Sequence, residues 1–138
     1  MTKGSARNIF IGGTVVAMAI FLVMTYLSHV SYPVRTHPEN ITEEVAWGKK
    51  VWEKHACIDC HTLLGEGAYY APELGNVVAR RGVEGVRNIL TIASKQGWGV
   101  DRKMPQFDLS KHDVDSLVEF FVWINEVDTN DWPPNIEG

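Results

Sequence analysis

The stretch KHACIDCHTLLGEG, residues 54–67, decides the fold of this 138-residue chain. It contains both cysteines of the sequence, Cys57 and Cys60, and His61 follows the second one directly. Three kinds of site use such a pair: a redox-active dithiol, a metal site with further ligands, and a site of covalent cofactor attachment. The spacing and the surrounding sequence distinguish among them.

The order Cys-x-x-Cys-His is the attachment signature of c-type haem. In that chemistry the two thiols add to the porphyrin vinyl groups, and the adjacent imidazole becomes an axial ligand of the iron. Cysteines three apart on a helical turn match the separation of the two vinyls, and the same turn carries the histidine beneath the iron. The sequence therefore predicts one covalent haem c held by Cys57, Cys60 and His61.

The two rival interpretations lack the rest of their motifs. Zinc prefers four ligands, and only an unpaired histidine such as His55 or His112 could join the CxxCH residues, without the second ligand pair of common zinc spacings. A thioredoxin-like dithiol follows a strand within a βαβ pattern, whereas the sequence before Cys57 has a helical pattern. Haem attachment remains the prediction.

The sixth coordination position of such an iron decides between electron transfer and ligand chemistry. Met104 is the one methionine beyond residue 30, and Pro105 follows it in an irregular stretch after Gly97. A loop of this kind can turn a thioether toward the iron, so we expect Met104 to be the second axial ligand. The competing candidates are His55 and His112.

Coordination by His61 and Met104 would leave no open position on the iron and would raise its reduction potential. Such a centre relays one electron at a time and is not an enzyme by itself. We expect Trp98 to form part of the wall around the porphyrin.

An apolar segment near the N-terminus, from Ile9 to Val30, contains no formally charged side chain. As a helix it would be roughly 33 Å long, enough to cross a hydrocarbon core of about 30 Å. A cleaved signal peptide would have a shorter apolar core and a small-x-small cleavage site, and residues 26–32 offer no such site. The sequence predicts a single uncleaved transmembrane helix.

Charge predicts the orientation of this span. Lys3 and Arg7 precede it without a nearby acid, and positive flanks stay in the cytoplasm. We expect a cytoplasmic N-terminus (1–8), a transmembrane helix (9–30), an extended linker (31–39) and a domain (40–138) that is periplasmic if the source is a bacterium. From residue 38 onward 10 Lys and Arg stand against 17 Asp and Glu, and a net charge of −7 disfavours nucleic acid as a partner.

The domain begins and ends with predicted helices. Asn40 with Glu43 resembles a capping box and opens a helix that leads to the cysteine pair. Ser110 with Asp113 resembles a second cap, before apolar residues spaced three and four apart up to residue 124. No alternating strand pattern is present, so we expect an all-α fold.

Two shorter helical patterns lie between these helices, over 72–81 and 83–95, and Gly97 would end the second. The stretches 62–71 and 97–109 have little regular pattern. A helical domain of about 100 residues with long irregular connections has a thin core by itself. We therefore expect the cofactor to fill its centre.

These features together resemble a class I cytochrome c domain, in which the first and last helices cross. Gly48 and Trp52 match its small-plus-aromatic crossing pattern, and the Met-Pro loop lies in the matching order. Pro72 with Leu74 resembles the P-x-L that follows the haem site. The resemblance implies that the carbonyl of Pro72 receives the N–H of His61, which would orient the imidazole and raise its basicity.

More specific stretches resemble the small cytochrome c subunit of bacterial nitric oxide reductase. They are CHTLLGEGAYYAPEL (60–74), KMPQF (103–107) and TNDWPP (129–134), and with the N-terminal anchor they extend the resemblance over essentially the whole chain. The resemblance implies a heterodimer in the bacterial inner membrane with a large catalytic subunit that holds haem b and a haem b3/non-haem iron centre. The small subunit would take electrons from a periplasmic cytochrome c or cupredoxin and pass them to haem b, for the reduction of NO to N2O in denitrification.

The same resemblance implies a calcium ion shared with the large subunit and ligated partly by Gly67 and Tyr69. The sequence itself contains no calcium-binding loop, so the alternative is that GEGAYY forms only an interface turn. The expected docking residues are Glu66, Tyr70, Trp132, Pro133 and Pro134.

Two other functions are compatible with a covalent haem on a membrane anchor. An electron shuttle would serve another respiratory complex without a tight partner. A haem-based sensor would keep the sixth iron position weak or vacant.

Overall fold

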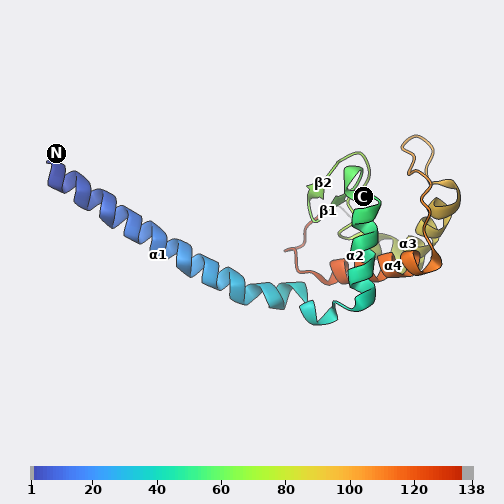
Figure 1. Ribbon diagram of the computed structural model, residues 1–138, viewed down its shortest axis with the longest axis horizontal. Helices are drawn as coiled ribbons and strands as arrows, with labels where there is room; N and C mark the ends of the chain where they lie inside the picture. The colour runs from blue at the N-terminus through green and yellow to red at the C-terminus, as the bar shows by residue number, and fades with distance from the viewer. Residues whose placement is uncertain (1, 135–138) are drawn as a thin grey trace. The chain divides into compact units, whose positions relative to one another are not determined.

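The computed structural model describes residues 2–134 and is mostly helical, as expected for an all-α chain (Figure 1). Its elements in order are α1 (Lys3–Thr36), the 3-10 turn η1 (Pro38–Asn40), α2 (Glu43–Lys54), the 3-10 turn η2 (Cys57–Asp59), the short strands β1 (Thr62–Leu63) and β2 (Glu66–Gly67), α3 (Val77–Gln96) and α4 (Lys111–Glu126). The chain divides into two compact units, one up to Arg35 and one from Thr36 onward.

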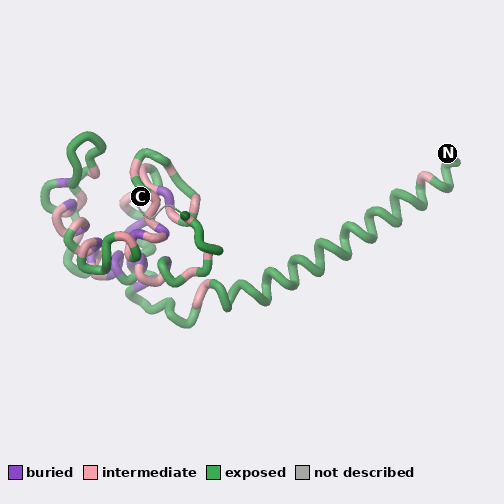
Figure 2. The backbone as a smooth tube through the Cα atoms, turned by 180° about the vertical axis from the view of Figure 1, so that it is seen from behind, coloured by how far each residue is buried: buried purple, intermediate pink, exposed green. Residues whose placement is uncertain are grey.

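Helix α1 accounts for nearly all of the N-terminal unit and contains the apolar segment 9–30. None of its residues is buried (Figure 2). Phe10, for example, is 76% exposed. Apolar side chains left exposed along a helix that is long enough to cross a bilayer are typical of a membrane span. The helix is a candidate membrane anchor, in agreement with the predicted span.

The predicted extended linker over 31–39 is wrong in its first part, because α1 continues through Pro33 to Thr36. A proline inside a helix removes one backbone hydrogen bond, and it can kink the helix without ending it. The helix stops before His37, whose backbone is left-handed with a φ of 45°. Pro33 therefore does not end the helix. The helix ends at Thr36, directly before the left-handed backbone of His37.

The predicted capping box of Asn40 and Glu43 is also wrong. The N-cap of α2 is Thr42, whose side-chain oxygen accepts a hydrogen bond from the backbone N–H of Val45 at 3.2 Å. Asn40 lies in the preceding 3-10 turn, and its side-chain amide donates instead to the carboxylate of Glu126 at 2.8 Å. Thr42 caps the helix because its extended backbone has the geometry that an N-cap requires.

Helix α3 joins the two shorter predicted patterns across a kink at Gly82, whose φ of 69° is not helical. The first of them begins at Val77 and not at Pro72, because the chain before it is held against the cofactor-attachment segment: the N–H of Leu74 donates to the carbonyl of Thr62 at 2.9 Å. The helix ends at Gly97 with a φ of 78°, as predicted.

Helix α4 has the capping box that the sequence predicted. The backbone N–H of Asp113 donates to the hydroxyl of Ser110 at 3.1 Å, and the Asp113 carboxylate accepts from the Ser110 N–H at 3.0 Å. Burial would raise the pKa of Asp113, but hydrogen bonds from Ser110 and Trp47 outweigh it and lower that pKa. The predicted apolar face of α4 is buried, and its members are Val114, Leu117, Val118, Phe121 and Ile124.

Helices α2 and α4 approach each other closely at Gly48. A Cβ at this position would lie 2.0 Å from the carbonyl oxygen of Ser116 and 2.8 Å from the Cβ of Phe120. One turn later Trp52 packs edge-on against Phe121, with ring centroids 5.8 Å apart. This arrangement is the small-plus-aromatic crossing that the resemblance implied.

Replacing Gly48 by alanine should destabilise the domain by about 3 kcal/mol, because the added methyl group overlaps the α4 backbone, which cannot move aside as a side chain can. Thermal unfolding of the full chain in detergent measures this loss. Gly85→Ala is the matched control, since that helical glycine would meet only the Cβ of Arg81 at 3.3 Å. The control should change stability by less than about 1 kcal/mol, and equal losses in both variants would contradict the proposed close crossing.

Candidate cofactor site

The turn after α2 presents both thiols and an imidazole to one cavity. Ala56 adopts a left-handed backbone with a φ of 49°, and the N–H groups of Cys60 and His61 both donate to the carbonyl of Cys57, at 3.2 and 2.9 Å. Both cysteines are free, and burial raises the pKa of the Cys57 thiol to about 11. Without a cofactor, that sulfur is therefore a neutral thiol at physiological pH.

The ring of His61 is held in one orientation by the chain beyond the motif. Its Nδ1 lies 2.8 Å from the carbonyl oxygen of Pro72, and since a carbonyl only accepts, Nδ1 carries the proton. Burial lowers the pKa of His61, an effect that the hydrogen bond to Pro72 partly opposes. A neutral imidazole with Nδ1–H engaged leaves Nε2 with its lone pair, which is the form that binds a metal.

Cys57, Cys60 and His61 line a cavity of about 370 Å³, within the range of about 300 to 1,000 Å³ that is usual for ligand pockets. Apolar side chains form most of its other walls: Trp52, Pro72, Leu74, Val77, Val86, Ile89, Leu90, Trp98, Leu117 and Phe121. An apolar cavity with two thiols and a neutral imidazole on one wall has the chemistry that a thioether-linked porphyrin needs. The residues present fit haem c, and Trp98 lies where the sequence analysis expected it.

Met104 also lines this cavity, at the end of a loop that leaves α3 at Gly97. The backbone of Met104 pairs with that of Trp98, with N···O distances of 2.7 and 3.0 Å, so the loop closes on itself. Of the two competing histidines, His55 lines the cavity and packs its ring 5.5 Å from that of Phe107, whereas His112 packs against Trp47 and is not among the lining residues. The structure therefore leaves Met104 and His55 as candidates for a sixth ligand.

A carboxylate that the sequence analysis missed organises the chain around Pro72. Glu73 accepts three backbone N–H groups, from Leu64 at 2.9 Å, from Gly65 at 3.3 Å and from Gly75 at 2.7 Å. Its own carbonyl accepts a hydrogen bond from the guanidinium of Arg80. Glu73 therefore joins the turn between β1 and β2 to the segment whose carbonyl orients His61.

Replacing Glu73 by alanine should lower the free energy of unfolding by about 2 kcal/mol, because three N–H groups lose a charged acceptor. Denaturant unfolding of the full chain measures the loss. Glu66→Ala is the control, since that glutamate stands exposed in the same hairpin. If both variants unfolded at the same denaturant concentration as the unmodified chain, the role of Glu73 would be disproved.

The hairpin of β1 and β2 contains the first of the residues expected to hold calcium, and the second follows it closely. Gly67 has a φ of 120°, and a Cβ there would lie 2.3 Å from the carbonyl oxygen of His61, so the position requires glycine. Tyr69 is 79% exposed. Within residues 2–134 no group of three or more His, Cys, Asp or Glu is arranged to hold a metal ion, and the shared calcium stays a prediction.

The expected docking residues lie near this hairpin and on the C-terminal tail. Glu66 is exposed and Tyr70 is 50% exposed. Trp132 is 40% exposed, and its ring lies over Gly65, with a ring atom 3.4 Å from where a Cβ of that glycine would be. Pro133 is half-buried and Pro134 is exposed. These residues are accessible, and their docking role stays a prediction.

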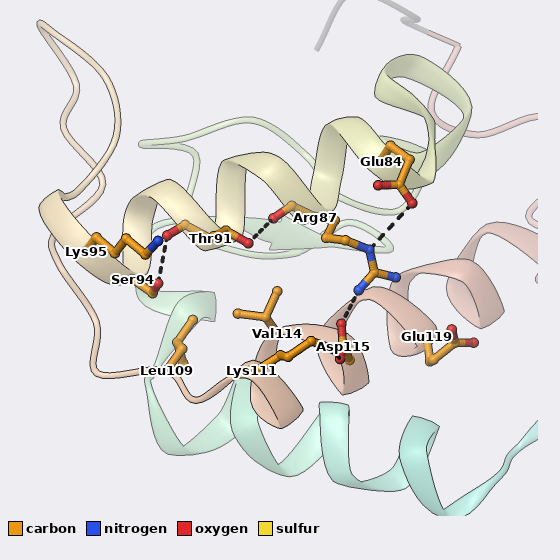
Figure 3. Close-up of a pocket in the computed structure, with 10 residues that line it drawn as sticks. All are labelled: Glu84, Arg87, Thr91, Ser94, Lys95, Leu109, Lys111, Val114, Asp115 and Glu119. Carbon is orange, nitrogen blue, oxygen red and sulfur yellow. Dashed lines mark hydrogen bonds and ion pairs between the residues drawn. The ribbon is translucent and has the colours of Figure 1, made fainter.

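A larger groove, of about 810 Å³, lies between α3 and α4 (Figure 3). Arg87 forms ion pairs with Glu84 and Asp115, and Lys111 pairs with Asp115 as well. The two cysteines, His61 and Met104 all lie outside its lining. Its charges neutralise one another on an exposed surface, so we interpret it as a solvated groove between two helices and not as a cofactor site.

Comparison with known proteins identifies the family. The family model described as cytochrome c matches residues 45–125. The C subunit of nitric oxide reductase from Stutzerimonas stutzeri is 50% identical over 141 residues, which cover 99% of this chain and 97% of the relative. The proteins of the same name from Paracoccus denitrificans and Halomonas halodenitrificans are 43% and 42% identical, each over all of this chain and 97% of its own length.

The chain belongs to the family of nitric oxide reductase C subunits. Its domain is therefore a cytochrome c, a family in which haem c is bound covalently, and Cys57 and Cys60 sit in the haem-binding position. The described residues, 2–134, contain one candidate membrane span before that domain, so this member of the family is an electron-transfer cytochrome with a candidate N-terminal anchor. The match over the whole length agrees with the resemblance found in the sequence.

Proposed function

We propose that this chain is the electron-entry subunit of a nitric oxide reductase, and that the site for NO reduction lies on its partner subunit. The observation that carries the proposal is the cavity that Cys57, Cys60 and His61 share with Met104, in a chain whose relatives are named as C subunits of nitric oxide reductase. When bound, haem c supplies a one-electron couple.

Each residue of the cavity has a defined task in this proposal. Cys57 and Cys60 would hold the cofactor by thioether bonds, and His61 and Met104, which line the same cavity, would supply the ligands of its iron. Pro72 fixes the direction of the His61 ring through its carbonyl. Apolar walls exclude water and so limit the reorganisation that accompanies a change of charge. An iron ligated by both His61 and Met104 would have no position for NO, which is why catalysis is assigned to the partner.

The partner and donor follow from the family resemblance. The partner is a large membrane subunit with haem b, haem b3 and a non-haem iron, which reduces NO to N2O. Electrons arrive from a periplasmic cytochrome c or cupredoxin. Gly67 and Tyr69 contribute to a calcium site shared with that partner, next to docking residues of the same hairpin.

The positive residues Lys3 and Arg7 before the span favour a cytoplasmic N-terminus and a periplasmic domain in the bacterial inner membrane. Haem attachment to the domain and electron entry would then both occur on the periplasmic side. Protease treatment of intact spheroplasts should remove the domain, whereas protection of the domain would reverse this orientation.

Purification in mild detergent tests the proposed complex. A pyridine haemochrome spectrum of the purified material should report both haem b and haem c, because the large subunit accompanies the chain. Recovery of the chain solely as a free monohaem protein would favour the electron shuttle instead. A colourless protein after correct maturation would remove the cytochrome assignment altogether.

A further inference from the structure

The loop that carries Met104 is anchored firmly at its base. The N–H of Gly97 donates to the carbonyl of Ala93 at 3.2 Å, and the N–H of Phe107 donates to the same carbonyl at 3.4 Å. Gly97 and Gly99 have φ values of 78° and 100°, conformations that other residues rarely adopt. The tip of the loop lies between Gly99 and Met104, and Val100 in this tip is 94% exposed.

The opposite rim of the cavity, formed by residues 68–71, is hydrogen-bonded to the turn that carries Cys57 and Cys60. The N–H of Ala68 donates to the carbonyl of Ile58 at 3.0 Å, and the N–H of Ala71 donates to the carbonyl of Cys60 at 2.8 Å. Tyr70 lies between these two bonds and lines the cavity. Its main chain is therefore fixed relative to the cysteines and to His61.

Arg102 connects the two rims. Its Nη1 donates to the carbonyl oxygen of Tyr70 at 2.9 Å, and its guanidinium carbon lies 5.8 Å from the centre of the Tyr70 ring. Arg102 is two residues before Met104 and also lines the cavity. One side chain thus makes both a hydrogen bond and a cation–π contact from the methionine loop to the segment that is bonded to the attachment turn.

We propose that Arg102 is a positioning residue that holds the loop closed and so keeps the Met104 thioether at the cavity. The inference rests on the proposed role of Met104 as the second axial ligand. The backbone pair between Trp98 and Met104 ties Met104 only to the loop itself. Without Arg102 the loop would be fixed to the rest of the domain at its base alone and would have to be ordered each time the thioether binds, at a cost in free energy for every residue. The contacts of Arg102 with Tyr70 hold the loop in place before the thioether binds, and so they reduce that loss of conformational entropy on binding.

Arginine is the residue suited to this task. Its planar guanidinium can donate to a carbonyl and lie over an aromatic ring at the same time, whereas the ammonium of lysine is a compact charge without a planar face. The contacts are exposed, so their individual effect is modest. Together they should change the equilibrium between a bound and a released thioether between about threefold and tenfold.

Imidazole binding to the ferric haem of the full, matured chain in detergent tests the inference. Exogenous imidazole binds only after Met104 has left the iron, so its apparent affinity reports how firmly the loop is held. Arg102→Ala should raise that affinity between about threefold and tenfold, and Arg102→Lys should raise it nearly as much. Lys95→Ala is the control, since this cation near the end of α3 lies outside the lining of the cavity, and it should leave the affinity unchanged.

A double-mutant comparison tests whether Arg102 acts through its contact with the Tyr70 ring and not through its charge alone. Tyr70→Ala removes the ring but keeps the carbonyl that accepts from Arg102, so this comparison reports the cation–π contact alone. Adding Tyr70→Ala to Arg102→Ala should have less effect than Tyr70→Ala alone. Full rescue by Arg102→Lys would overturn the inference.

Met104→Ala in the same assay separates the ligand role of Met104 from the positioning role of Arg102. This variant should bind imidazole more tightly than any Arg102 variant. Unchanged affinity in Met104→Ala would reject the ligand assignment itself. A strong effect of Met104→Ala together with no effect of Arg102→Ala would reject only the positioning role.

Discussion

Replacement of Met104 by alanine is expected to lower the reduction potential of the haem and to open its sixth position to external ligands. A thioether stabilises the reduced iron, so its loss should lower the potential by about 100 mV or more, a fraction of the roughly 0.8 V over which axial ligands set haem potentials. Redox titration of the full chain measures the shift. The ferrous variant should also bind CO promptly, whereas the unmodified chain should not.

Two further variants decide whether the effect belongs to Met104. Met24→Ala removes a thioether from α1 and should leave the potential unchanged. His55→Ala tests the other cavity-lining candidate. An unchanged potential in Met104→Ala, combined with an opened iron in His55→Ala, would transfer the ligand role to His55. Prompt CO binding by the unmodified chain without loss of Met104 would instead support the sensor.

The features that the sequence predicted correctly depend on residues close together in the chain. The capping box of Ser110 and Asp113 lies within one helical turn, and Gly97 ends α3 by its own backbone conformation. The failed capping box at Asn40 shows the limit of such signals, because Thr42 two residues later also has a side chain that can cap. Local patterns thus identified which helices form more reliably than where each one begins.

The residues of the candidate site also differ in whether the sequence alone could predict them. The CxxCH residues could be identified because attachment chemistry needs them in consecutive order. The three hydrogen bonds to Glu73 and the contacts between Arg102 and Tyr70 join residues that are 2 to 32 positions apart in the sequence. No periodic pattern in the sequence marks these residues. A glutamate after proline, or an arginine in a loop, has many ordinary surroundings on a protein surface. Their roles are visible only once the fold brings the two rims of the cavity together.

Replacement of both Cys57 and Cys60 by alanine should abolish covalent haem attachment. Each thioether comes from one thiol, and no other cysteine exists in the sequence to replace them. Acid acetone should then extract nearly all of the haem from the double variant and almost none from the unmodified chain. Either single variant should keep its haem through the remaining bond, which makes the two single variants matched controls.

The double variant should also lose much of its stability, which tests whether the cofactor is part of the core. The walls of the 370 Å³ cavity include Trp52, Leu90, Leu117 and Phe121, side chains that also belong to the buried core of the domain. A small domain cannot leave such a cavity at its centre without losing packing energy on every wall. Haem that can dissociate stabilises the fold only by mass action, so thermal unfolding of the double variant should depend on added haem, while the single variants should not. Haem that still resists extraction after both thiols are removed would refute the attachment, because no other side chain in the cavity can form the thioether bonds.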